Sequence, residues 1–220
     1  LYLPHATSLR MGPLGYQSSA QASLHISYNA LAEYAQSMVD ALTTLYPSYV
    51  SAGVKHAGEY QQLNASILQI ENEFYGTIRP KRTAASGERP ITALKARGVE
   101  YVEVRCIDLN PFLAVGIDQQ QIDFLDTFLL LCLLADSDDD SVTESAHLSR
   151  NQQLVVEHGR DFTTRLTRPN GEDVRLTDWA EELLDACISI ADLLDRTHED
   201  ERYGTSLATQ RAKLADPSLT

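Results

Sequence analysis

The most informative polar residues in this sequence are an acid and a base two positions apart, Glu103 and Arg105. The alternating pattern around them predicts a strand over residues 99–107, in which both side chains point to one face about 7 Å apart. The opposite face is apolar and is formed by Val102, Val104 and Cys106. On a central strand, a charged pair must face water, a ligand or a metal ion, because burying it alone is costly. A carboxylate on Mg²⁺ beside a guanidinium on a phosphate would fit, and so would a weak surface ion pair.

Two earlier segments carry further candidate ligands. Glu71 and Glu73 alternate just before Tyr75. Both could bind a metal ion, or one could be buried in hydrogen bonds while the other faces water. Residues 79–90 begin with a basic run and are predicted to form a polar loop. That loop is either a solvated surface segment or a cover over a polyanion such as the phosphates of a nucleotide.

A third candidate is the glycine-bearing loop 11–15, which Arg10 and Tyr16 flank. A guanidinium binds a carboxylate through two parallel hydrogen bonds, and a phenol beside it would complete a small carboxylate site. The same residues also fit an ordinary surface turn with an exposed arginine. The spacing alone leaves both interpretations open.

Helices and short strands are predicted to position these residues. An apolar stripe predicts a helix between Asn29, as its cap, and Pro47, and residues 66–70 read as a strand. The strand over 99–107 leads into a helix capped by Asp118. Further apolar stripes predict helices in the C-terminal third, and a last, polar helix is predicted over residues 203–215. The class is therefore α+β, with residues 1–135 as the strand-containing domain and residues 136–220 as a helical portion.

The composition excludes several classes of function. The 220 residues carry 18 basic and 31 acidic side chains, a formal charge of −13, so the surface repels nucleic-acid phosphates and anionic membranes. The longest apolar run, 128–135, is far shorter than the ~20 residues that span a bilayer. Neither a P-loop nor a Rossmann glycine motif is present. A protein that handles ATP with this sequence would need another fold.

The three cysteines, Cys106, Cys132 and Cys187, are widely spaced among apolar residues. This predicts reduced, buried thiols and a cytoplasmic protein. The chain begins with Leu1 rather than methionine and ends in a turn-like sequence, 215–220, so we expect an internal piece of a longer protein.

Three blocks of the sequence resemble one enzyme family. They are residues 2–10, residues 68–82 with Glu71 and Tyr75, and residues 98–112 with Glu103, Arg105 and Asp108. In this order they are similar to the bacterial glutamate–cysteine ligases, also called γ-glutamylcysteine synthetases. The similarity covers essentially the whole chain and weakens after residue 136. The family chain is longer, so the resemblance implies that a substantial N-terminal segment and a shorter C-terminal one are missing here.

The resemblance implies a glutamine-synthetase-like α+β fold, whose mostly antiparallel sheet forms a funnel around the substrates and is only partly present here. It implies that ATP phosphorylates the side-chain carboxylate of glutamate and that the amine of cysteine then attacks the acyl phosphate. Mg²⁺ or Mn²⁺ and arginines would stabilise the charge of the transferring phosphoryl group. The implied partners are glutamate, cysteine and ATP, with neither nucleic acid nor membrane.

Carried over position by position, Glu103 resembles a metal ligand and Arg105 resembles the arginine at the ATP phosphates, so both are expected at the catalytic centre. Arg10, Tyr16 and Tyr75 resemble the residues of the cysteine pocket, with Arg10 placed for the substrate carboxylate. The family's other metal carboxylates and its metal-binding histidine would lie upstream of Leu1. The chain therefore holds only part of a site, and alone it is expected to be inactive.

Two other functions remain open from the sequence. One is a non-catalytic, acidic helical module that recruits a basic partner. The other is a related carboxylate–amine ligase with a different amine substrate, which Tyr16 and Tyr75 disfavour.

Overall fold

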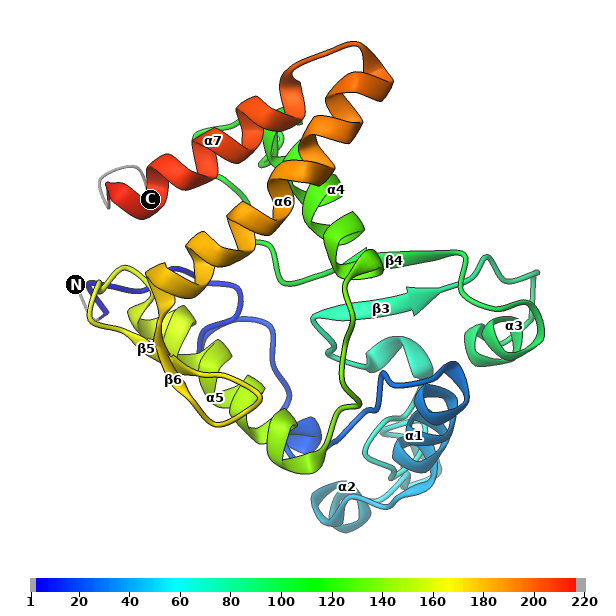
Figure 1. Ribbon diagram of the computed structural model, residues 1–220. Coiled ribbons are helices and arrows are strands. Elements are labelled where there is room, and N and C mark those ends of the chain that lie inside the picture. The colour runs from blue at the N-terminus through cyan, green and yellow to red at the C-terminus, as the bar shows by residue number, and fades with distance from the viewer. Residues whose placement is uncertain (1–2, 217–220) are drawn as a thin grey trace. The chain divides into compact units, whose positions relative to one another are not determined.

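The computed structural model describes residues 3–216 and contains helices and short antiparallel strands, which confirms the α+β class (Figure 1). The helices are α1 Leu31–Thr43, α2 Pro47–Ala52, α3 Pro90–Arg97, α4 Gln119–Leu134, α5 Val142–His158, α6 Leu176–His198 and α7 Arg202–Ala215. The strands form three separate pairs, β1 Lys55–His56 with β2 Glu59–Tyr60, β3 Ile78–Lys81 with β4 Tyr101–Val104, and β5 Arg165–Thr167 with β6 Asp173–Arg175. Tyr2, where the first block of similarity begins, and residues 217–220 of the predicted turn lie outside the described residues. In the described part there is no helix with the length and apolar character that a bilayer crossing requires.

The chain divides into two compact units, which we call the helical unit and the hairpin unit. The helical unit comprises Leu1–Gly12, Asp108–Asp138 and Thr143–Thr220, and the hairpin unit comprises Pro13–Ile107 and Asp139–Val142. The predicted division at residue 135 concerns the domain plan of the longer protein, and it stays a prediction.

The core of the helical unit lies between α4, α6 and α7 (Figure 1). It is formed by the buried side chains of Leu184, Cys187, Ala191, Tyr203 and Leu207. Phe124, Phe128 and Leu131 of α4 pack against it. The predicted cap of α4 is confirmed, since the carboxylate of Asp118 accepts a 2.8 Å hydrogen bond from the backbone N–H of Gln121.

The expectation of three buried thiols holds for Cys187 alone. All three cysteines are free, but Cys106 is half-buried and Cys132 is exposed. Helix α4 packs against the core through Phe124, Phe128 and Leu131. Cys132 follows Leu131 on the neighbouring side of the helix and therefore faces outward.

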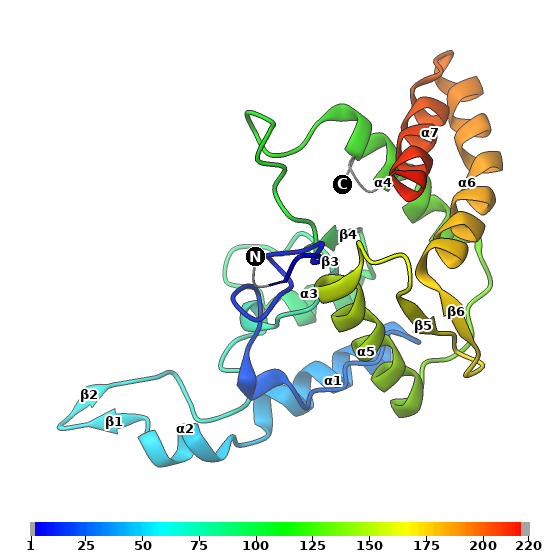
Figure 2. The ribbon, with the colours of Figure 1, turned by 90° about the vertical axis from the view of Figure 1, so that its left-hand side faces the viewer.

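The core of the hairpin unit lies under α1 and α3. Tyr34, Met38 and Ala41 of α1 pack on Leu68 and Phe74, together with Ile91 and Leu94 of α3. Helix α1 follows the predicted range, but its N-cap is Ala30 without a side-chain bond, and Asn29 instead accepts a 2.6 Å bond from the backbone N–H of Asp140. Figure 2 shows α2 and the β1–β2 hairpin at the end of α1 that lies away from β3 and β4.

The prediction of a strand over residues 66–70 is wrong. Only an isolated bridge joins Ser66 to Leu45, and the fully buried Leu68 donates its backbone N–H to Ala41 at the end of α1. The end of α1 therefore accepts a backbone hydrogen bond that a neighbouring strand would otherwise have accepted.

The prediction that residues 79–90 form a loop is wrong at its start, where Ile78–Lys81 forms β3. In the antiparallel register Arg79 lies opposite Glu103 and Pro80 lies opposite Val102. The proline is tolerated because a two-stranded sheet has free edges. For the same reason β4 is not a central strand within residues 3–216, and its Val102 is 46% exposed.

One buried polar network connects α4 with α7 in the helical unit. The Asp123 side chain is 2% exposed, accepts a 2.9 Å hydrogen bond from Gln119, and lies 3.4 Å from Nε of Arg202. Beside it, the buried hydroxyl of Ser206 donates to the carbonyl of Gln120 at 2.6 Å. A buried carboxylate is stable only while these donors remain in place.

We expect Asp123→Asn to lower the free energy of unfolding by about 2 kcal/mol, because it removes the charge that Gln119 and Arg202 stabilise. The matched control is Asp126→Asn, an exposed carboxylate on the same helix. Urea denaturation measures both changes. Equal stabilities of the two variants would contradict a structural role for the Asp123 charge.

Candidate functional site

The pairing of β3 with β4 surrounds one carboxylate with cations. Nζ of Lys81 and a guanidinium nitrogen of Arg105 each lie 3.6 Å from Oε2 of Glu103, and Arg79 is the cross-strand neighbour of Glu103. The predicted pair Glu103 and Arg105 is therefore brought together on one face. Oε2 of Glu103 is buried and accepts no hydrogen bond from any described residue, which fits a carboxylate oxygen that a hard metal ion would bind.

Arg79 is the functional candidate that the sequence did not single out. The residue is only 5% exposed, one terminal nitrogen donates to the carbonyl of Asn72 at 3.1 Å, and the guanidinium lies 5.6 Å from the ring of Phe74. Its Nε–H has no acceptor among residues 3–216. Burial lowers the pKa of Arg79, and the nearby positive charge of Arg105 lowers it further. The sequence signals were its place at the start of the basic run and its alternation with Lys81, which matches that of Glu103 with Arg105.

Tyr16 and Tyr75 form an aromatic pair beside this charged face. Their ring centroids are 4.4 Å apart, and the guanidinium of Arg105 lies 5.1 Å from the ring of Tyr16. A guanidinium over a phenol ring gains cation–π attraction. Two residues predicted for the cysteine pocket thus lie next to each other, and one of them, Tyr16, contacts the arginine predicted for the phosphates.

Gln21 holds the backbone that carries Tyr75. Its side-chain oxygen accepts the N–H of Tyr75 at 2.9 Å, and its amide nitrogen donates to the carbonyl of Glu73 at 3.0 Å. Gln21 is 9% exposed, so both bonds are largely shielded from water.

Arg10 belongs to the helical unit and not to the unit that holds Tyr16 and Tyr75. The backbone N–H groups of Leu9 and Arg10 donate to the carboxylate of Asp108 at 3.0 and 2.7 Å. The place of Arg10 in the same pocket as the tyrosines stays a prediction.

Glu71 and Glu73 do not present a metal site. They lie in a 3₁₀ turn, Glu71–Glu73, instead of alternating along a strand. Glu71 accepts hydrogen bonds from Arg89 at 2.7 Å and from the N–H of Ile91 at 2.8 Å, and Glu73 accepts the N–H of Gln69 at 2.7 Å. Nowhere in residues 3–216 do three His, Cys, Asp or Glu side chains gather to hold a metal ion. The metal role of Glu103 therefore needs ligands from other parts of the protein and stays a prediction.

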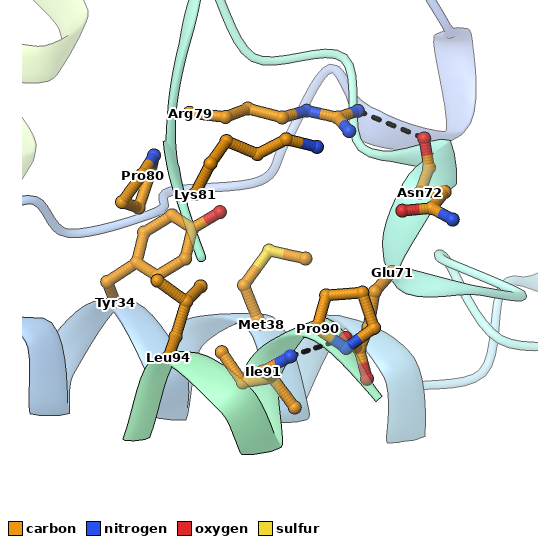
Figure 3. A pocket seen from close by; sticks show the side chains of 10 residues that line it. All are labelled: Tyr34, Met38, Glu71, Asn72, Arg79, Pro80, Lys81, Pro90, Ile91 and Leu94. Carbon is orange, nitrogen blue, oxygen red and sulfur yellow. Dashed lines mark hydrogen bonds between the residues drawn. The ribbon is translucent and has the colours of Figure 1, made fainter. Parts of the chain in front are cut away.

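A small cleft of about 30 Å³ lies between β3, α1 and α3 (Figure 3). Figure 3 shows the side chains of Arg79 and Lys81 extending side by side above Met38 and Tyr34, with Glu71 at the far side. This volume holds a water molecule or two but no nucleotide. Within the hairpin unit, the cleft gives Arg79 access to a small polar partner.

The sequence of this chain is similar to those of known proteins. A family model described as glutamate–cysteine ligase matches residues 1–155. The glutamate–cysteine ligases of Pseudomonas paraeruginosa and Saccharophagus degradans are 52% and 49% identical over 220 and 221 aligned residues, covering 100% of this chain and 41% and 42% of theirs. The chain thus spans about two-fifths of the length of these relatives.

Two solved structures superpose on this chain. The glutamate–cysteine ligase of Francisella tularensis, solved in complex with AMP, superposes with a TM-score of 0.89 at 36% identity, over 98% of this chain and 42% of that one. A bifunctional glutathione synthetase from Pasteurella multocida has a TM-score of 0.61 at 19% identity over 98% of this chain and 23% of that one, which shows a shared fold only.

We expect Gln21→Leu to destabilise the protein by about 2 kcal/mol, because the N–H of Tyr75 and the carbonyl of Glu73 lose their buried partner. The matched control is Gln17→Leu, which removes a solvent-exposed side-chain bond to the carbonyl of Pro13. Thermal and urea unfolding measure the difference. If the two variants unfold alike, Gln21 does not support the segment that carries Tyr75.

Proposed function

Because this chain belongs to the glutamate–cysteine ligase family, we propose that it forms part of an enzyme that joins the γ-carboxylate of glutamate to the amine of cysteine at the expense of ATP. The product would be γ-glutamylcysteine, formed through a γ-glutamyl phosphate in the first step of glutathione biosynthesis. The observation that carries the proposal is the β3–β4 face, on which Glu103 lies among Lys81, Arg79 and Arg105.

The chemistry of phosphoryl transfer explains this set of charges. The triphosphate of ATP and the phosphoryl group in transfer carry negative charge, which cations in a water-poor site stabilise. The guanidinium of Arg105 forms a 3.6 Å ion pair with Glu103, and we propose that it also binds a phosphate of the nucleotide. Its packing over the ring of Tyr16 limits the positions that the guanidinium can take.

Glu103 is the residue of this chain that we propose as a metal ligand. A bound Mg²⁺ or Mn²⁺ would neutralise phosphate charge and orient the triphosphate. The buried Oε2, which accepts no hydrogen bond from residues 3–216, is the oxygen suited to that role. The cations of Lys81 and Arg105, each 3.6 Å from Oε2, attract the carboxylate and limit its orientation.

Arg10, Tyr16 and Tyr75 are the residues that we propose for cysteine. The guanidinium of Arg10 would take the carboxylate of the amino acid in two parallel hydrogen bonds. The paired rings of Tyr16 and Tyr75 provide a wall against which a small side chain can pack. The contact of Tyr16 with Arg105 would bring the amine near the phosphorylated carboxylate.

ATP as the nucleotide is supported by the AMP bound to the Francisella tularensis ligase. The other partners that we propose are glutamate and the remaining segments of the same enzyme, with no nucleic acid and no membrane. An acidic surface with a charge of −13 and free cysteines fits a cytoplasmic enzyme.

We expect Arg105→Ala and Glu103→Gln in the full-length enzyme each to lower kcat at least ~100-fold, because each removes charge stabilisation of the transferring phosphoryl group. The control is Arg82→Ala, which removes a cation that forms a long 3.8 Å pair with Glu100. ADP release that depends on glutamate and cysteine gives the rates. Wild-type rates in both site variants would remove these two roles.

The 220-residue chain by itself should show no measurable ligase activity, because it spans only about two-fifths of its relatives, and its residues 3–216 contain no group of three side chains that could hold a metal ion. The same ADP-release assay, run beside the full-length enzyme, checks this. Turnover of the isolated chain at the full-length rate would show that the site is complete within it.

A further inference from the structure

The carboxylate of Asp108 holds the segment that carries Arg10. One oxygen accepts the backbone N–H groups of Leu9 and Arg10 at 3.0 and 2.7 Å, and the other accepts the hydroxyl of Ser8. The oxygen of Ser8 in turn accepts the N–H of Met11 at 3.0 Å. One side chain thus fixes four consecutive residues, directly or through Ser8.

The residues just before this segment are anchored at the end of α5. The N–H of Thr7 donates to the carbonyl of Val156 at 2.9 Å, and its hydroxyl donates to the carbonyl of Val155 at 2.6 Å. The carbonyl of His5 accepts the N–H of Arg160 at 3.0 Å. Figure 2 shows the start of the chain running beside the end of this helix. These hydrogen bonds to the end of α5 reach no further than Thr7, so the conformation of the following backbone depends on Asp108.

Hydrophobic burial contributes little to the order of this segment. Leu9 is 74% exposed, and Arg10 and Met11 are only half-buried. A segment with few apolar contacts keeps its conformation through hydrogen bonds, and those to a charged acceptor are the strongest. The position of the Arg10 backbone is therefore set mainly by the carboxylate of Asp108.

We propose that Asp108 is a positioning residue for the amine substrate: it fixes the backbone of Arg10 so that the guanidinium meets the substrate carboxylate in a two-bond geometry. This rests on the cysteine role proposed above for Arg10. A displacement of about 1 Å in a positioning group can lower the rate ~100-fold. A fixed backbone at Arg10 therefore limits how far its long side chain can depart from the position that binds the substrate. Asp108 acts through Arg10 and need not touch the substrate.

The experiment is a double-mutant cycle in the full-length enzyme with Asp108→Ala and Arg10→Ala. We expect Arg10→Ala to raise the KM for cysteine roughly 10- to 100-fold through loss of a charged two-bond contact. Asp108→Ala should raise the same KM about 10-fold, with the KM values for ATP and glutamate changed less than about twofold. In the Arg10→Ala background, Asp108→Ala should add less than about a further twofold, because its effect passes through Arg10.

Two further variants separate positioning from simple loss of structure. Asp108→Asn keeps one acceptor oxygen for the two N–H groups and should restore most of the affinity for cysteine. The matched control is Asp161→Ala, which removes a carboxylate that accepts the N–H and hydroxyl of Thr163 at 2.8 and 2.7 Å in another loop of the helical unit. It should leave the KM for cysteine unchanged, whatever it does to the melting temperature.

The outcomes are distinct. A full-length enzyme without ADP release that depends on glutamate and cysteine would overturn the proposed function itself. In an active enzyme, the positioning role is overturned if Arg10→Ala leaves the KM for cysteine unchanged. It is equally overturned if Asp108→Ala has its full effect in the Arg10→Ala background, or if Asp108→Ala and Asp161→Ala change all three KM values alike.

Discussion

The antiparallel register of β3 and β4 is the constraint on which the candidate site depends. It places Arg79 opposite Glu103 and so brings three cationic side chains around one carboxylate. Because side chains alternate along a strand, a slip of β4 by one residue would turn Glu103 to the opposite face, which Val102 and Val104 now occupy. The core under α1 and α3, which includes Phe74 beside Arg79, opposes such a slip. The fold of the hairpin unit and the chemistry of its charged face thus share one cause.

The sequence was sufficient for features with a local cause. The alternation around Glu103 and Arg105 predicted a strand and a shared face, and the cap at Asp118 predicted the start of α4; both are confirmed. Features that depend on distant partners were not predictable. Residues 66–70 have a strand-like pattern but hydrogen-bond to the end of α1. Propensity does not determine the outcome when tertiary contacts compete with it.

The same distinction applies to individual residues of the site. Arg79 looked like part of a solvated basic loop, because the pairing that buries it involves a strand more than twenty residues away. Gln21 gave no signal, since its function lies in two backbone bonds near Tyr75. By contrast, Tyr16 and Tyr75 were chosen by resemblance, and their 4.4 Å contact gives that choice a geometric basis within the hairpin unit.

The unsatisfied polar atoms of the hairpin unit favour a ligand that carries both signs of charge. Nε of Arg79 is a buried donor without an acceptor among the described residues, and Oε2 of Glu103 is a buried acceptor without a donor at hydrogen-bond distance. The unpaired Nε–H of Arg79 lowers stability by about 1–3 kcal/mol, whereas Oε2 of Glu103 has two cations at 3.6 Å. Arg79 and Glu103 occupy opposing positions of one strand pair. An anion alone would satisfy only the arginine and a cation alone only the carboxylate, whereas a metal-bound phosphate would satisfy both.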